Sequence, residues 1–149
     1  WIYSPFGANF LKTMLRIAKE RDAIRVVCDQ RGNPTSALDI ADAILEVARR
    51  LAALPQDAAL RGVFHLVGQG EASWAEFAAA ILESSAELGG PVADVVPITT
   101  AEYQTPARRP GNSRLSGGKL SAEYDLTLPD WHLSMREVVR RLIDPVEAQ

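Results

Sequence analysis

The chain has 149 residues, about the size of one domain, and 47% of them are hydrophobic, which is enough to form a core. It has 16 Lys and Arg residues against 19 Asp and Glu residues, a net charge of -3, and no long apolar run, so neither a nucleic-acid partner nor a membrane is expected. The single cysteine, Cys28, excludes an internal disulfide; its thiol is interpreted as buried and inert, and the protein is expected to be cytoplasmic.

The first half of the chain alternates between predicted helices and strands. A helix is expected over residues 9–19, a strand over 24–28 and a loop over 29–34. Thr35 or Ser36 can cap the next helix, and Asp39 is placed to complete a capping box from Ser36. The inward stripe of that helix is predicted to be Ile40, Ile44, Val47 and Leu51.

The second half continues the alternation and ends in a helix. A second strand is expected over 63–67, a turn over 68–70, and a helix after the S-x-x-E capping box of Ser73 and Glu76. A third strand over 92–98 leads into an irregular stretch over 99–118, and helices are expected over 119–124 and 131–143. This order predicts an α/β fold with residues 1–149 as a single domain. The inward residues are predicted to be Phe77, Ile81, Leu82, Met135, Val138, Val139 and Leu142.

Several common catalytic patterns are absent from the sequence. There is no G-x-G-x-x-G turn between a strand and a helix and no phosphate-binding P-loop. His65, in the predicted strand between two apolar residues, is interpreted as structural, and His132 as exposed at a helix start. Neither histidine has neighbours spaced as metal ligands, so no metal site is predicted.

The segment 105–115, TPARRPGNSRL, is the richest in binding chemistry. Arg108, Arg109 and Arg114 lie in a proline-stiffened loop, and a guanidinium binds phosphate through a planar fork of donors. Asn112 and Ser113 add neutral hydrogen-bonding groups that suit a sugar or a base. The alternative is a solvated loop whose arginines pair with local carboxylates, and composition alone favours neither interpretation.

Two further segments contain candidate binding residues. Gln30 and Asn33 lie in a loop that follows a strand, where open α/β sheets commonly bind ligands, although a structural turn is the favoured interpretation from the residues alone. Trp1 and Tyr3 precede a Pro/Gly break and would suit a sugar pocket, although core packing is favoured for them. A chain that begins with Trp in such an apolar stretch is expected to be processed or truncated.

These segments together resemble the dTDP-4-dehydrorhamnose reductase family. WIYS at 1–4, NF at 9–10 and KTML at 12–15 resemble the middle of those enzymes, and DQRGNPT at 29–35 resembles their D-Q-x-G-x-P-T loop. The matches continue in collinear order over the whole chain. They comprise GVFHL at 62–66, SW at 73–74, TPARRPGNSRL at 105–115, which resembles T-P-A-R-R-P-x-N-S-R-L, and LPDW at 128–131.

The resemblance implies the C-terminal, substrate-binding part of an extended short-chain dehydrogenase. In that family an N-terminal Rossmann segment binds NADPH or NADH, and a hydride passes to C4 of dTDP-4-dehydro-L-rhamnose to give dTDP-L-rhamnose. The family's catalytic Tyr, in a Y-x-x-x-K motif, would lie upstream of Trp1, and no Tyr in this chain has Lys four residues later. We therefore expect no catalytic residue here, no cofactor bound to this chain alone, and a missing Rossmann segment as its partner.

The resemblance also assigns binding roles by position. Trp1 would pack on the sugar ring, the arginine segment would face the nucleotide or diphosphate, and Gln30 and Asn33 would line the same cleft. Leu38 and Arg141 fall near positions where some relatives hold a metal with carboxylates, which argues against such a metal. The expected binding residues are Trp1, Gln30, Asn33, Arg108, Arg109, Asn112, Ser113 and Arg114.

Two other functions compete with this interpretation. One is a non-catalytic module that binds a nucleotide sugar or regulates another protein. The other is a related extended short-chain reductase or epimerase that acts on another nucleotide sugar. A natural half-protein is also expected to expose an apolar face and to form homo-oligomers.

Overall fold

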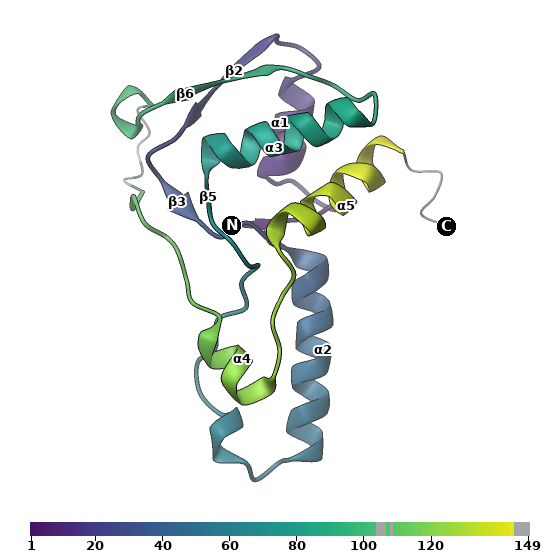
Figure 1. Cartoon of the computed structure of the whole chain (residues 1–149), viewed down its shortest axis with the longest axis vertical. Helices are drawn as coiled ribbons and strands as arrows, with labels where there is room; N and C mark the ends of the chain where they lie inside the picture. Colours follow the sequence, from purple (N-terminus) through teal and green to yellow (C-terminus); the bar gives the residue numbers. More distant parts are fainter. Residues whose placement is uncertain (104–106, 108, 145–149) are drawn as a thin grey trace.

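The computed structural model describes residues 1–103, 107 and 109–144, and it confirms the predicted α/β class (Figure 1). Within this part of the chain no helix is both long enough and apolar enough to span a membrane. Short 3-10 turns cover Ala58–Leu60 and Thr100–Glu102. The other elements are β1 (Ile2–Tyr3), α1 (Phe10–Ile17), β2 (Ala23–Val27), β3 (Arg31–Gly32), β4 (Thr35–Ser36), α2 (Ala37–Ala53), β5 (Ala72–Ser73), α3 (Trp74–Glu87), β6 (Asp94–Ile98), α4 (Gly118–Tyr124) and α5 (Trp131–Ile143).

The described strands form three two-stranded pairs. β2 and β6 run parallel, with Ala23 opposite Asp94 and Val27 opposite Ile98. β1 pairs in parallel with β4, and β3 pairs antiparallel with β5. The region predicted as a loop over 29–34 therefore contains a short strand, β3, because its backbone finds a partner in a segment about 40 residues later in the chain.

The larger hydrophobic core lies among α1, α3 and α5, beneath the β2–β6 pair in the view of Figure 1. Phe77, Ile81, Val138 and Val139 are each at most 1% exposed, as the helical spacing predicts, and Leu11 of α1 is also fully buried. Cys28, which was expected to be buried, is half-buried against this core.

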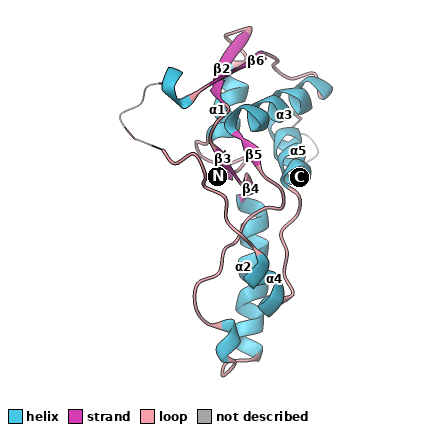
Figure 2. Cartoon of the chain, turned by 60° about the vertical axis from the view of Figure 1, so that its left-hand side comes forward, coloured by secondary structure: helices cyan, strands magenta, loops and turns pink. Residues whose placement is uncertain are grey.

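A second core lies between α2 and α4, which run side by side in Figure 2. Its buried residues include Ala43, Leu60 and Tyr124, and the Tyr124 hydroxyl donates to the carbonyl of Leu60 at 2.7 Å. Most of the predicted stripe of α2 packs here, but Ile44 is 53% exposed, so its predicted inward position is wrong. The buried stripe of α2 is thus narrower than the periodicity indicates.

The predicted strand over residues 63–67 is wrong. Among the described residues no strand lies beside this stretch, and an extended segment becomes a strand only when a neighbour satisfies its backbone groups. The chain is paired only further on, where the amide of Gln69 donates to the carbonyl of Pro129 at 3.0 Å. His65 is consequently exposed rather than enclosed in a sheet, with Nδ1 3.3 Å from the carbonyl oxygen of Ser116. His132 is exposed as predicted.

The two predicted capping boxes have different outcomes. At α3 the box is confirmed: the Glu76 amide donates to Ser73 Oγ at 3.1 Å, and the Ser73 amide donates to Glu76 Oε2 at 2.6 Å. At α2 the hydroxyl of Ser36 accepts from the Leu38 amide, as an N-cap does, but the box with Asp39 is wrong. The carboxylate of Asp39 instead accepts from the hydroxyl of Ser134 on α5, because a tertiary donor lies within its reach.

An aromatic stack connects the start of the chain to α3. The indole of Trp1 lies on that of Trp74, with ring centroids 3.7 Å apart and planes 10° from parallel, and Phe10 packs on Trp74 at 4.6 Å. The edge of the Trp1 indole lies against Gly32 of β3, where a Cβ atom would collide with the ring. Because Gly32 has no side chain, it leaves room for the Trp1 indole at this position.

Replacing Glu76 with Gln tests the charge in the α3 capping box. The Ser73 amide, followed by the Ser73 hydroxyl and Arg31, lowers the pKa of Glu76 below its ordinary value of 4.5. A carboxyl group with a lowered pKa stabilises the fold above its ordinary pKa, and this contribution is lost as the pH falls through the folded-state value. Urea denaturation should show Glu76→Gln less stable than the parent at pH 7, with the difference vanishing in acid; a difference that is constant with pH contradicts the prediction.

Replacing Gly32 with Ala should push the Trp1 indole off Trp74. Overpacking of this kind costs about 1–3 kcal/mol of unfolding free energy. Stacked indoles give a coupled signal in circular dichroism, and we expect Gly32→Ala to lose it. Gly117→Ala is the control, because a Cβ there meets nothing closer than Val67 at 3.7 Å. Retention of the coupled signal in Gly32→Ala would show that the ring is not held by this contact.

Candidate functional site

The arginine loop, defined here as residues 109–115, is held against β3 by backbone hydrogen bonds. The Arg31 amide donates to the carbonyl of Gly111 at 2.8 Å, and the Ser113 amide donates to the carbonyl of Arg31 at 2.8 Å. Arg31 and Asn112 thus face each other as in a parallel ladder. Because β3 also pairs with β5, the loop is attached to a frame formed by two other segments.

Two asparagine side chains strengthen this attachment. Asn33 donates from Nδ2 to the carbonyl of Gly70 at 2.8 Å and accepts from the Leu115 amide at 2.8 Å, so one amide group joins three segments. Asn112 accepts at Oδ1 from both the amide and Nε of Arg114, at 3.1 and 2.9 Å. Both were predicted as ligand-binding residues, and in this structure both order the loop.

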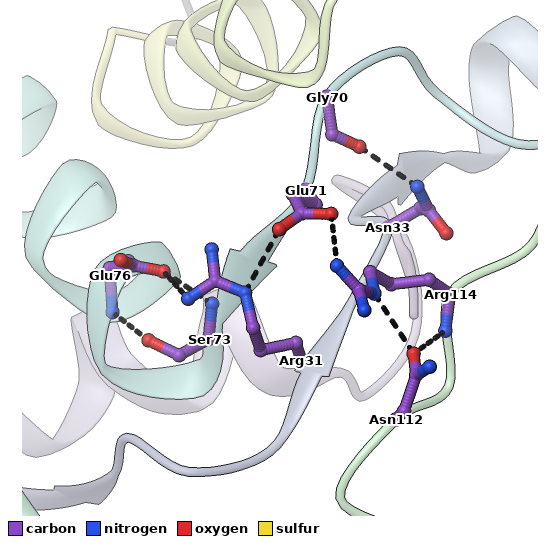
Figure 3. A network of polar contacts seen from close by, with 8 residues as sticks. All are labelled: Arg31, Asn33, Gly70, Glu71, Ser73, Glu76, Asn112 and Arg114. Atoms are coloured by element: carbon purple, nitrogen blue, oxygen red, sulfur yellow. Dashed lines mark hydrogen bonds and ion pairs between the residues drawn. The ribbon is translucent and has the colours of Figure 1, made fainter.

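Four charged side chains form what we call the glutamate–arginine cluster, shown in Figure 3. Arg114 Nη1 lies 2.7 Å from Glu71 Oε2, and Arg31 Nε lies 3.0 Å from Glu71 Oε1. Arg31 also reaches Glu76, with Nη1 3.4 Å from Oε2. Each oxygen of Glu71 therefore binds a guanidinium from a different part of the chain.

The electrostatics of the cluster follow from these contacts. Hydrogen bonding from Arg114, and then from Arg31, lowers the pKa of Glu71. The carboxylate is therefore ionised at neutral pH, and two positive charges in the cluster face two negative ones. The interpretation of 105–115 as a loop whose arginines pair with carboxylates is accordingly correct for Arg114.

Arg109 differs from Arg114 in its surroundings. It is exposed and has no ion-pair partner among the residues that the structure describes. Ser113 is also exposed, while its amide is used in the ladder with Arg31. Arg108, the third predicted arginine, lies outside the described residues. Arg109 therefore carries the unbalanced positive charge of the described loop.

Gln30 is placed differently from the other predicted residues. It is 6% exposed, and its Nε2 donates to the Thr100 hydroxyl at 3.1 Å. Asp29 accepts from the Thr100 hydroxyl at 2.6 Å and from its amide at 2.9 Å, and these bonds lower the pKa of Asp29. Gln30 and Asp29 thus anchor the segment after β6 to the segment after β2, and the side chain of Gln30 is buried there.

Trp1, Asn33 and the arginine loop all meet at β3. Trp1 lies against Gly32, its carbonyl accepts from the Thr35 amide at 2.8 Å, and Asn33 follows β3 directly. A hollow of about 540 Å³ adjoins the loop, since Asn33, Gly70 and Leu115 line it together with backbone of Gly68 and Gly117. This volume suits a small organic ligand.

The sequence interpretation missed three residues of this site. Arg31 occupies a variable position in the D-Q-x-G-x-P-T pattern, and Glu71 precedes a capping box without any pattern of its own. Trp74 was noted only as part of a motif, although it supports the Trp1 ring. The one feature of the sequence that could have indicated Glu71 was the surplus of arginines in 105–115. Arginines that do not bind a ligand would need carboxylate partners within the protein.

Comparison with known proteins gives consistent matches. The family model described as the RmlD substrate binding domain matches residues 1–143. The dTDP-4-dehydrorhamnose reductase of Sinorhizobium fredii is 48% identical over 96% of this chain, and that of Escherichia coli K12 is 41% identical over 95% of it. The alignments cover 48% and 47% of those two proteins, so the chain spans about half the length of the curated relatives it matches.

A solved structure shows the same arrangement of elements. The crystal structure of dTDP-4-dehydrorhamnose reductase from Bacillus anthracis in complex with NADP superposes with a TM-score of 0.80 at 32% identity. The alignment covers 93% of this chain and 45% of that one. Because the family model matches residues 1–143, nearly the whole of this chain, the chain belongs to the RmlD substrate binding domain family.

Proposed function

We propose that this chain is the sugar-nucleotide-binding part of an NAD(P)H-dependent dTDP-4-dehydrorhamnose reductase. The parent protein would reduce dTDP-4-dehydro-L-rhamnose to dTDP-L-rhamnose, and residues 1–149 would form its substrate domain. The relatives named for this activity support the parent reaction, and the relative solved with NADP supports NADP(H) as its cofactor.

The observation that carries the proposal is the exposed Arg109, which has no ion-pair partner in the described part of the chain and lies on a loop that is hydrogen-bonded to β3. A diphosphate has charged oxygens that accept from a guanidinium fork, and such charge-assisted bonds are stronger than neutral ones. Because the loop is already attached to β3 and through Asn33 to Gly70, less conformational entropy is lost when a ligand binds. Arg109 would therefore bind the diphosphate, with Ser113 exposed nearby in the same loop.

The rest of the ligand would extend along β3. The hollow beside Asn33 and Leu115 has room for a ring of the nucleoside or the sugar, and Trp1 would offer an indole edge or face at the sugar. Asn112 and Asn33 would act mainly by ordering the loop, because Asn112 already binds Arg114 and Asn33 already binds the backbone of Gly70 and Leu115. Arg114, held by Asn112 and Glu71, would support Arg109 at the diphosphate. Gln30 would support the site indirectly, through its bond to Thr100.

The reaction divides between this chain and the rest of the parent protein. The nicotinamide cofactor supplies the hydride, and a segment outside this chain would bind it, since the sequence has neither a Gly-rich dinucleotide turn nor Y-x-x-x-K. This chain would contribute binding energy from the remote nucleotide, which fixes the sugar ring in a reactive position. Alone it would be inactive, and its partners would be the Rossmann segment and further copies of the protein, in the cytoplasm.

The test is calorimetric titration of the full-length protein that contains this chain with dTDP-L-rhamnose and, separately, with NADPH. The parent should bind both ligands. Arg109→Ala should weaken dTDP-L-rhamnose binding by about tenfold to a hundredfold, because a hydrogen bond to a charged group contributes about 1.5–3 kcal/mol. NADPH binding should be unchanged.

Arg136→Ala is the matched control, because Arg136 is an exposed arginine of α5, away from the arginine loop. It removes the same charge and should leave both affinities as in the parent. Equal affinities of Arg109→Ala and the parent for dTDP-L-rhamnose would contradict the assigned role of Arg109. Binding of neither ligand by the parent would favour a non-catalytic module, and tight binding of another nucleotide sugar would favour a related reductase or epimerase.

A further inference from the structure

We propose that Glu71 is a positioning residue that orients Arg114 toward the diphosphate of the nucleotide sugar. This inference rests on the proposed function and extends it to a residue that binds no ligand itself. Glu71 would act through the guanidinium it holds, and the arginine loop would carry the effect to the ligand.

The first argument is geometric. Arg114 donates from Nε to Asn112 Oδ1 at 2.9 Å and from Nη1 to Glu71 Oε2 at 2.7 Å. Two bonds from different nitrogens determine the plane and the direction of a rigid guanidinium. They leave Nη2 without a partner among the described residues, available to donate to a ligand oxygen (Figure 3). A donor held in advance in this way binds without reorganisation.

The second argument concerns the position of Glu71 itself. On one side of Glu71, the carbonyl of Gly70 accepts from Asn33 Nδ2 at 2.8 Å. On the other side, β5 begins at Ala72 and pairs with β3. The backbone on both sides of Glu71 is thus tied to the frame that holds the arginine loop. A single exposed ion pair contributes little, but this carboxylate joins two guanidiniums within a fixed backbone.

The third argument is electrostatic. Glu71 separates the charges of Arg31 and Arg114, and it binds both at 3.0 Å or less. Without its charge, the guanidiniums of Arg31 on β3 and Arg114 on the arginine loop would keep only Glu76 as an acidic partner among the described residues, and of these two arginines Glu76 contacts only Arg31. Arg114 is attached to the exposed loop, so the loss of attraction should move Arg114 rather than Arg31.

The opposite role for Glu71 makes an opposite prediction. If the carboxylate occupied the place of the ligand's phosphate, its removal would free Arg114 and tighten binding. The bridge between two arginines argues against this, because Glu71 also holds Arg31, whose Nε and Nη1 are both used within the cluster. If the Glu71 carboxylate competed with the ligand's phosphate, it would have to leave Arg31 and Arg114 at the same time before the ligand could bind.

The test compares Glu71→Gln with the parent in the full-length protein that contains this chain. Glutamine keeps the size of the side chain and removes its charge. The dissociation constant for dTDP-L-rhamnose should rise about fivefold to tenfold, and in turnover KM for the sugar nucleotide should rise while kcat stays near the parental value. NADPH affinity should be unchanged, which also shows that the variant is folded.

Two further variants test whether Glu71 affects ligand binding through Arg114. Arg114→Lys keeps the charge but has one nitrogen instead of a fork, so it should lose about as much affinity as Glu71→Gln. The double variant Glu71→Gln/Arg114→Lys should be no weaker than Arg114→Lys alone, since both changes break one interaction. Glu123→Gln, which removes an exposed glutamate on α4, is the charge control and should match the parent.

The outcomes separate this inference from the proposed function. Tighter or unchanged dTDP-L-rhamnose binding by Glu71→Gln would overturn the positioning role while the parent's own binding upholds the function. Additive losses in the double variant would also overturn it, because Glu71 would then act by another path. Failure of the parent to bind dTDP-L-rhamnose would overturn the function and this inference with it.

Discussion

Two backbone hydrogen bonds between Arg31 and the arginine loop are the constraint on which the site depends. They connect residues about 80 positions apart, and they place Asn112 directly beside β3. Once the loop lies there, the amide of Asn33 can bridge Gly70 and Leu115, and the carboxylate of Glu71 comes within reach of Arg114. Each polar group that attaches the loop would lack its partner if this pairing were absent.

The arginines near this pairing fall into two groups, which differ in whether they form ion pairs. Arg114 and Arg31 are neutralised by Glu71 and Glu76, and they hold the loop in place. Arg109 lies at the start of the exposed arginine loop and has no ion-pair partner among the described residues. An arginine with an ion pair and one without a partner among the described residues thus lie five positions apart, and composition alone could not separate them because both are the same residue type.

The helices were predictable because their signals are local. Spacing of apolar residues located α1, α3 and α5, and the box of Ser73 and Glu76 marked the start of α3 in the right place. The failures share one cause. Asp39 found a donor on another helix, Ile44 faces outward, and residues 63–67 have no strand beside them among the described elements. In each case a distant contact, or the lack of one, outweighed the local pattern.

The sequence by itself determined the α/β class, most helix positions and the family, because apolar periodicity, caps and ordered motifs all lie within short windows. It also located the arginine-rich loop, since three guanidiniums in seven residues are visible without a structure. Only the tertiary structure decided which arginine is paired and that Glu71 is its partner. Ion pairs depend on atoms a few ångströms apart in space, and Glu71 and Arg114 are 43 residues apart in the chain.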